Sequence, residues 1–169
     1  MKKFTILTIM FLLLLSVAQG QTEKKTALKK LQGTTVSSIA KNSFIEDFGN
    51  VSNVKWRRFD TFDQATFIQN GKEMVAFYDD RGSQVGTTSQ AVFTDLPASS
   101  QKDINEKYKD YKIGQVVFYK DNQDNDTDMI LYGVQFEDED NYFVEMAKGD
   151  SKIVLRVDKV GNVTLFKKL

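Results

Sequence analysis

Acidic residues are the densest group of potential ligands in this sequence, and they begin with a run over residues 121–128 (DNQDNDTD). Every second residue from Asp124 to Asp128 is acidic, as are the first three ligands of an EF-hand calcium loop. That loop also needs glycine at its sixth position and glutamate at its twelfth, where this sequence has Met129 and Gln135. The pattern therefore predicts a solvated loop rather than an EF-hand, and it leaves weak Ca²⁺ binding open.

A second acidic cluster, residues 137–140 (EDED), follows the next strand-like run. In an antiparallel meander, each strand carries the chain from one end of the sheet to the other. We therefore expect the two acidic clusters to lie at opposite ends of the sheet, where they cannot share a cation.

Asp79-Asp80 and Asp158 could supply carboxylates for glycoside hydrolysis, but they lie in turn motifs, where aspartate commonly bonds the adjacent backbone. The sequence has no histidine and no cysteine. This composition excludes Ser-His-Asp and Cys-His nucleophile systems, zinc sites built on imidazole or thiolate, and an imidazole pH switch. We expect a protein that is not an enzyme and that holds no cofactor.

The elements that position these residues centre on a β-hairpin over residues 65–79. Its two apolar runs are joined by Asn70-Gly71, the pair that best tolerates positive φ at both centres of a type I′ turn. The second run ends at Asp79-Asp80-Arg81-Gly82, a further turn signal. Residues 84–93 are expected to form the next strand.

A short helix is predicted before this hairpin, over residues 38–48, from apolar residues at i, i+4 and i+8. Ser37 or Ser38 can cap its start, and Gly49 is a typical C-terminal stop. A strand over residues 54–59 is expected to link this helix to the hairpin.

Leu96-Pro97 interrupts the strand pattern and suits the entrance of a second helix. That helix is predicted over residues 98–111, where Ile104, Tyr108 and Tyr111 form one narrow apolar seam. Five strand-like runs follow, at residues 115–119, 129–136, 142–147, 152–157 and 163–166.

The predicted elements form two related halves, about 37–95 and 96–169, each with a short helix followed by antiparallel strands. Each half also has a strand that ends in Asp-x-x-Gly, at Asp79 and at Asp158, which favours a duplicated unit. The expected fold class is α+β, with tandem helix-plus-antiparallel-sheet repeats and the helices on one face of the sheet. The other face is expected to stay open to water.

The first 20 residues have the pattern of a secretory signal peptide. Lys2 and Lys3 supply the positive start, and an apolar run over residues 4–15 is too short to span a bilayer. A small-x-small site predicts cleavage near Gly20-Gln21. We expect a periplasmic or secreted protein with no membrane attachment after cleavage.

The mature chain of 149 residues is expected to consist of a flexible, lysine-rich N-terminus at residues 21–36 and one domain at residues 37–169. It has 21 basic and 23 acidic residues and therefore a net charge of −2. This balance argues against nucleic acid or an anionic membrane as partner.

Several weak motifs occur in a definite order between residues 44 and 166. They are Val54-Lys55-Trp56, Asn70-Gly71-Lys72, Asp79-x-x-Gly82, Leu96-Pro97 before a helix with Tyr108, and Val157-Asp158-x-x-Gly161. Together with the secretory leader, this order resembles the PepSY-like, or beta-lactamase-inhibitor-like, family of small secreted bacterial proteins.

The resemblance implies tandem helix-plus-sheet repeats, a PepSY-like domain over residues 37–169, and binding to other proteins rather than catalysis. PepSY domains of peptidase propeptides are associated with restraint of proteolysis, and structurally similar inhibitors hold a beta-lactamase against a concave sheet. No inhibitory-loop motif in this sequence matches those inhibitors residue by residue.

The residues expected to bind a protein or peptide partner lie on predicted strands. Trp56 is expected in the core, so Lys55 and Arg57 point the other way with Phe59 and form a mixed basic and aromatic face. The same role is predicted for four tyrosines, Tyr78, Tyr119, Tyr132 and Tyr142.

The predicted function is a secreted, non-enzymatic protein-binding module that inhibits or modulates an envelope or extracellular enzyme. The alternative is a small-ligand or Ca²⁺-binding envelope protein, which needs a concave apolar pocket or a metal site.

Overall fold

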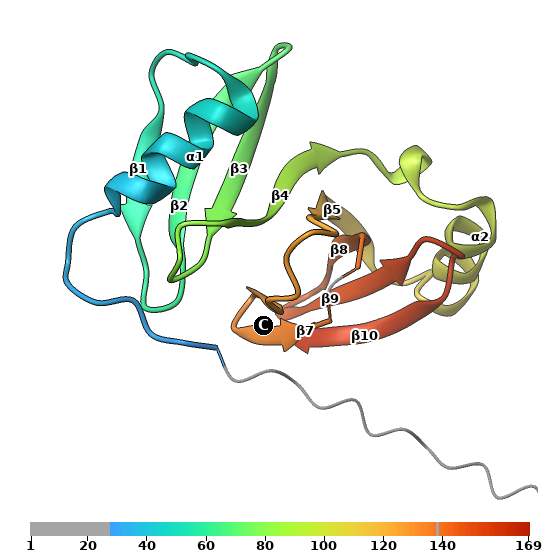
Figure 1. Cartoon of the computed structure of the whole chain (residues 1–169). Coiled ribbons are helices and arrows are strands. Elements are labelled where there is room, and N and C mark those ends of the chain that lie inside the picture. Colours follow the sequence, from blue (N-terminus) through green and yellow to red (C-terminus); the bar gives the residue numbers. More distant parts are fainter. Residues whose placement is uncertain (1–27, 138) are drawn as a thin grey trace, which may run out of the picture.

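A computed structural model describes residues 28–137 and 139–169. Within them, eight strands form one antiparallel sheet in the order β1-β2-β3-β4-β5-β8-β9-β10, and β6 pairs with β7 outside it (Figure 1). The N-terminal elements are α1 (Ser38–Phe48), β1 (Lys55–Arg58), β2 (Asp63–Gln69), β3 (Lys72–Tyr78), β4 (Gln84–Ala91) and the 3₁₀ helix η1 (Phe93–Asp95). The later elements are α2 (Ala98–Lys107), β5 (Lys112–Asp121), β6 (Met129–Leu131), β7 (Val134–Phe136), β8 (Asn141–Lys148), β9 (Ser151–Asp158) and β10 (Val163–Lys168).

The order of one helix followed by four sheet strands occurs twice. We call α1 with β1–β4 the first unit, and α2 with β5, β8, β9 and β10 the second unit. Antiparallel pairing of β4 with β5 joins the two units into one sheet. The β6–β7 hairpin is inserted between the first and second strands of the second unit.

Helix α1 has the bounds that the apolar spacing predicts. The Ser37 hydroxyl accepts a hydrogen bond from the backbone N–H of Ile39 at 3.1 Å and so caps the helix start. Gly49 ends the helix with φ = 75°, a conformation that glycine adopts without a steric cost.

The β2–β3 hairpin also forms as predicted. Asn70 and Gly71 have φ values of 52° and 75°, as a type I′ turn requires, and Gln69 pairs with Lys72 across the turn.

The two Asp-x-x-Gly turns have the same hydrogen bonds. In each turn, one carboxylate oxygen of Asp79 or Asp158 accepts the backbone N–H groups two and four residues later, at 2.8–3.0 Å. The aspartate carbonyl then accepts the N–H of Gly82 or Gly161 at 3.1 Å. The side chain thus closes the same turn after the third strand of each unit.

The glycine of each turn also lies against the start of the helix of its own unit. A Cβ atom on Gly82 would come within 2.9 Å of the backbone nitrogen of Ala40 in α1. A Cβ atom on Gly161 would contact Ser99 and Pro97 at the start of α2. Each turn therefore fixes the position of a helix start over the sheet.

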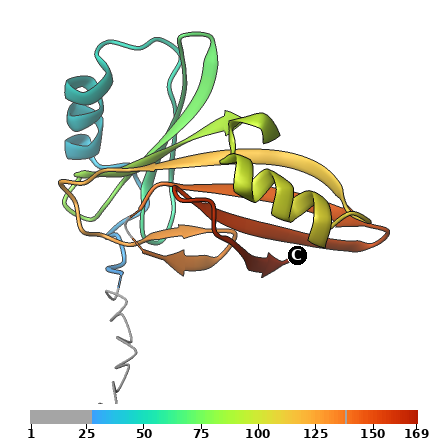
Figure 2. The ribbon, with the colours of Figure 1, turned by 90° about the vertical axis from the view of Figure 1, so that its right-hand side faces the viewer.

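Both helices pack on the same face of the sheet, as predicted. Ala40 and Phe44 of α1 contact Ala65, Phe67 and Ala76, and Ile104 of α2 contacts a cluster that includes Val116 and Val144. Side chains of directly paired residues lie on the same face of a sheet. Following the pairs from β3 to β4 and from β4 to β5 shows that Val116 of β5 lies on the same face as the β3 residues under α1. Figure 2 shows the two helices over separate parts of the sheet.

The expectation of a single strand over residues 129–136 is wrong, because this segment folds back on itself. Tyr132 and Gly133 have φ values of 52° and 73° and form the turn between β6 and β7. Met129 and Phe136 of the hairpin pack with Tyr119 and Phe143 on the helix-free face.

The helix-free face is therefore open only in part. In the second unit, the hairpin converts it into a second core that also includes Phe166 of β10. In the first unit, the helix-free side chains of β1–β3 other than Phe77 remain exposed or half-buried. We call the part of this surface away from the hairpin the open face; it consists of Lys55, Thr66, Ile68, Glu73 and Val75.

The other differences from the predicted bounds are small. The second helix ends at Lys107 instead of residue 111, and the following strand begins at Lys112 instead of residue 115. The strand after the first Asp-x-x-Gly turn ends at Ala91 instead of residue 93.

The predicted signal peptide at residues 1–20 lies outside the described residues, as do residues 21–27 of the predicted flexible N-terminus. The described part, residues 28–36, has no helix or strand but contacts the domain. Leu28 packs on the second core, and the N–H of Leu31 donates to the carbonyl of Asp60 at 2.7 Å. In the described part of the chain, no helix is both long and apolar enough to cross a membrane.

Candidate functional site on the helix-free face

A groove of about 580 Å³ lies where the open face meets the inserted hairpin. We call it the edge groove. It is lined by residues 57–62 at the end of β1 and in the following turn, Gln64 of β2, Phe77 of β3 and residues 129–133 of the hairpin. Its volume lies in the range of ligand pockets in proteins.

Packing from both units fixes the apolar walls of the edge groove. Phe62 and Phe77 meet edge to face with ring centroids 6.4 Å apart, and both belong to the second core. Ile130 and Leu131 of the hairpin also line the groove and pack against the same core. The groove thus joins two segments that are about 70 residues apart in sequence, and neither unit alone contains it.

The turn of the hairpin is held in place by Tyr132. Its hydroxyl donates to Glu145 of β8 at 2.8 Å, and burial together with this carboxylate raises the pKa of the tyrosine. The ring of Tyr132 lies 6.3 Å from that of Phe143. The hairpin wall is therefore anchored through both a hydrogen bond and ring packing.

Arg57 and Phe59 form the outer rim of the groove. The Arg57 guanidinium lies 4.6 Å from the centre of the Phe59 ring, a cation–π contact, and the Phe59 side chain is 40% exposed. Alternation along β1 places Lys55 on the same side as Arg57. Neither Lys55 nor Arg57 has an ion-pair partner among the described residues.

Arg58, which also borders the groove, is by contrast fully engaged. It makes a two-pronged contact with the buried carboxylate of Asp63 at 2.6 and 2.7 Å and donates to the carbonyl of Gln32 at 2.6 Å. The Asp63 bond raises the pKa of the guanidinium further. Arg58 therefore has a structural role and is not free to bind a partner.

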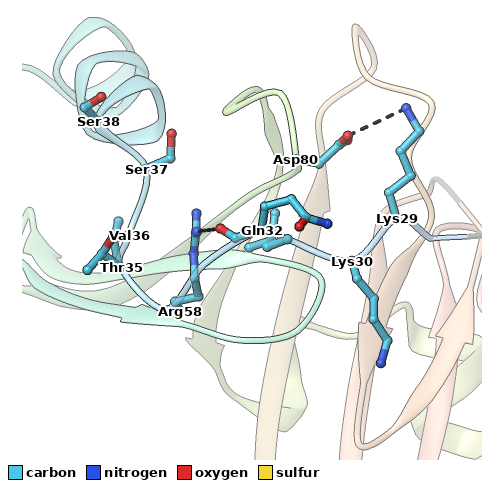
Figure 3. Close-up of a pocket in the computed structure, with 10 residues that line it drawn as sticks. Lys29, Lys30, Gln32, Thr35, Val36, Ser37, Ser38, Arg58 and Asp80 are labelled. Carbon is cyan, nitrogen blue, oxygen red and sulfur yellow. Dashed lines mark hydrogen bonds and ion pairs between the residues drawn. The ribbon is translucent and has the colours of Figure 1, made fainter.

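A larger cavity of about 880 Å³ lies beside the start of α1, where residues 29–32 cross the domain (Figure 3). Two of its cations already have partners within it: Arg58 donates to the carbonyl of Gln32, and Lys29 pairs with Asp80 at 3.6 Å. This cavity thus marks the attachment of the N-terminal segment, and we prefer the edge groove as the functional site.

For two of the four tyrosines, the prediction of partner binding is wrong, because their side chains are inaccessible. Tyr78 lies under α1, is 0% exposed, and donates to Asp47 at 3.2 Å. Burial and Asp47 raise its pKa. Tyr119 is also 0% exposed and lies under the hairpin, with its ring 5.1 Å from that of Phe136.

The remaining predicted residues are divided between the two faces. Lys55, Arg57 and Tyr132 lie on the helix-free side, and Arg57 and Tyr132 both line the edge groove. Tyr142 is half-buried on the helix side, where its ring packs 4.7 Å from that of Phe118. Burial raises its pKa. Trp56 packs against Phe44 under α1, as expected for a core residue.

The expected separation of the two acidic clusters is also wrong. Because residues 129–136 return as a hairpin, the backbone N–H of Asp121 donates to the carboxylate of Asp140 at 2.8 Å. Burial and the Asp140 charge raise the pKa of Asp121, while Lys159 pairs with Asp140 at 3.3 Å. Even so, the described residues contain no group of three or more acidic side chains placed to hold a metal ion.

The hairpin wall of the groove is the part that sequence reasoning missed. Ile130, Leu131 and Gly133 carry no functional motif, and the only local sign of a turn is Gly133 in an otherwise apolar run. The position of the wall depends on packing against Phe77 of the first unit, which no local pattern contains.

No protein-family model and no curated protein matches this sequence. Solved structures do match. A BLIP-like protein from Bacteroides fragilis has a TM-score of 0.59 at 16% identity, over 82% of this chain and 88% of that chain. A DUF2874 family protein from Bacteroides uniformis has a TM-score of 0.65 at 11% identity, over 79% and 90%.

A predicted periplasmic protein from Bacteroides eggerthii has a TM-score of 0.63 at 9% identity, over 80% of this chain and 88% of that chain. Matches of this extent at such low identity reflect shared architecture and not shared residues. Together with the eight-stranded sheet and its two helices, they show that this chain has the BLIP-like α+β fold.

Proposed function

We propose that the protein is a non-enzymatic, PepSY-like protein-binding module of the periplasm or the extracellular space. Its partner docks on the open face of the first unit. The observation that carries this proposal is the unequal cover of the helix-free face. The inserted hairpin buries it in the second unit, whereas Ile68 on the open face is 56% exposed.

The partner that we propose is an envelope or extracellular enzyme, whose activity the protein inhibits or modulates. The BLIP-like fold of the structural neighbours and the order of sequence motifs support this proposal. The signal-peptide pattern and the periplasmic neighbour support the location. The lack of histidine and cysteine in the sequence supports a non-catalytic role.

The experiment is affinity capture from the envelope and culture fluid of the source bacterium, with three forms of the protein as bait. The wild type is compared with Ile68→Asp on the open face and with Ile45→Asp on α1, a matched control because Ile45 is 49% exposed. We expect a protein that is retained by the wild type and by Ile45→Asp and lost with Ile68→Asp.

Equal retention by all three baits would place the contact elsewhere and contradict the proposal. A captured enzyme is then assayed with each form, and modulation should disappear with Ile68→Asp alone.

The edge groove also favours a second candidate, a small-ligand carrier, because it has a ligand-sized volume and apolar walls. The Ca²⁺ alternative is weaker, since in the acidic loop the Asp128 carboxylate is already bonded by Gln135 at 2.6 Å. A thermal melt with and without Ca²⁺ tests it, and an unchanged midpoint is expected.

A further inference from the structure

We propose that the edge groove binds a protein segment in which a large apolar side chain is followed by a carboxylate. The inference rests on the proposed function and names the part of the partner that enters the groove. It depends on three properties of the groove, which are its apolar walls, its uncompensated positive rim and its continuity with the open face.

The walls select an apolar side chain. Phe62, Phe77, Ile130 and Leu131 line the groove and are held by core packing, so its apolar lining is already formed. A preformed apolar groove binds an aromatic or aliphatic group without the cost of ordering its own walls.

The rim selects a negative charge. Arg58 is bound to Asp63, and Asp60, which also lines the groove, has Lys30 at 3.8 Å. Arg57 at the rim has no ion-pair partner among the described residues, and neither has Lys55, two residues away on the same side of β1. The planar guanidinium of Arg57, fixed over Phe59, can bind a carboxylate with two parallel hydrogen bonds.

Continuity with the open face favours a protein segment over a free small molecule. Gln64 lines the groove, and Thr66 and Ile68 follow on the same side of β2 at steps of two residues. A chain that leaves the groove along β2 therefore passes directly over the open face.

The test uses the whole protein and two synthetic peptides, acetyl-Leu-Phe-Glu-Glu-amide and its uncharged counterpart acetyl-Leu-Phe-Gln-Gln-amide. Amide NMR spectra are followed during titration at low salt. We expect the acidic peptide to shift the signals of Phe59, Leu131 and Tyr132. It should bind at least about tenfold more tightly than the uncharged peptide, a preference that added salt reduces.

Two variants, each of which removes one positive charge, distinguish a specific contact of the peptide with Arg57 from a non-specific effect of the net charge of the protein. Arg57→Gln should abolish the preference for the acidic peptide, whereas Lys120→Gln should retain it. Lys120 is exposed on the helix side, where it borders a cavity next to Asp47 of α1. Fluorescence of Trp56, the single tryptophan, checks that each variant keeps the α1 packing.

Equal binding of the two peptides, or signals that shift only on the helix side, would overturn the inference. Phenylacetate that binds as tightly as the acidic peptide would also overturn it, because the site would then suit a small carboxylic acid. The proposed function would stand in either case if the Ile68→Asp bait still lost its partner.

Discussion

The two units have the same scaffold but opposite uses of the helix-free face. Each has a helix over four strands and an Asp-x-x-Gly turn with the same hydrogen bonds. In the second unit, the hairpin inserted after β5 covers the helix-free face with Met129 and Phe136. In the first unit, β2 follows β1 after a four-residue turn, and the face remains open.

The difference shows how an insertion makes two similar units differ in exposure. The covered unit gains a second apolar core and with it stability, while the uncovered unit keeps the exposed face on which we propose that a partner docks. The inserted hairpin also supplies part of the lining of the edge groove. The second unit therefore contributes residues to a groove whose other residues belong to the first unit.

The largest expected effect concerns the covered face. Phe136→Ala should lower the free energy of unfolding by about 3–5 kcal/mol, because it leaves a cavity between Tyr119, Phe143 and Phe166. Thr66→Ala on the open face should change it by less than about 1 kcal/mol. Urea denaturation measures both, and equal losses would contradict the difference in packing between the two faces.

The next effect compares how the two turns contact their helices. Gly82→Ala and Gly161→Ala both place a side chain at positive φ, at 76° and 94°, which costs about 1–3 kcal/mol. Gly82→Ala should be the more damaging, because its Cβ would lie within 2.9 Å of the backbone of Ala40. At Gly161 the closest atom belongs to the side chain of Ser99, which can rotate away, and Pro97 is at 3.1 Å. Thermal melts of the two variants should therefore differ in that order, and the reverse order would contradict the argument from these contacts.

The smallest effect is a pH dependence in the second turn. Partial burial opposes ionisation of Asp158, but hydrogen bonds from Asn162 and the following backbone N–H groups outweigh it and lower its pKa below the usual 3.8. Its stabilising contribution is therefore complete above the unfolded pKa and is lost as pH falls through the lowered value. Asp158→Asn should weaken this acid-induced loss in denaturation curves at pH 5 and pH 3; an unchanged difference would contradict it.

Local patterns were sufficient to predict most of the fold. The bounds of α1 follow from the Ser37 cap and Gly49, and the Asn70-Gly71 turn fixes the β2–β3 register. The two Asp-x-x-Gly turns were recognisable because their hydrogen bonds are made within five residues. These features need no information from distant parts of the chain.

The hairpin at residues 129–136 could not be predicted in the same way. Its apolar run fits a buried strand, and Tyr132 adopts a φ of 52° that aromatic residues seldom have. Packing of Met129 and Phe136 on Tyr119 and Phe143 determines that the segment folds as a hairpin. The same error misplaced Tyr119 on an open surface and separated Asp121 from Asp140.

The candidate site was accordingly half predictable. Alternation with Trp56 was enough to place Lys55 and Arg57 together on the helix-free side, since it requires only the period of a strand. The opposing wall could not be inferred, because it arises from contact between segments far apart in sequence.

The two margins of the sheet are both positively charged. One is the short strand β1, with Lys55 and Arg57, and the other is β10, with Lys167 and Lys168. Like charges at both margins oppose the alignment of one molecule alongside another through backbone hydrogen bonds. The charges at its two margins thus protect the sheet against edge-to-edge aggregation.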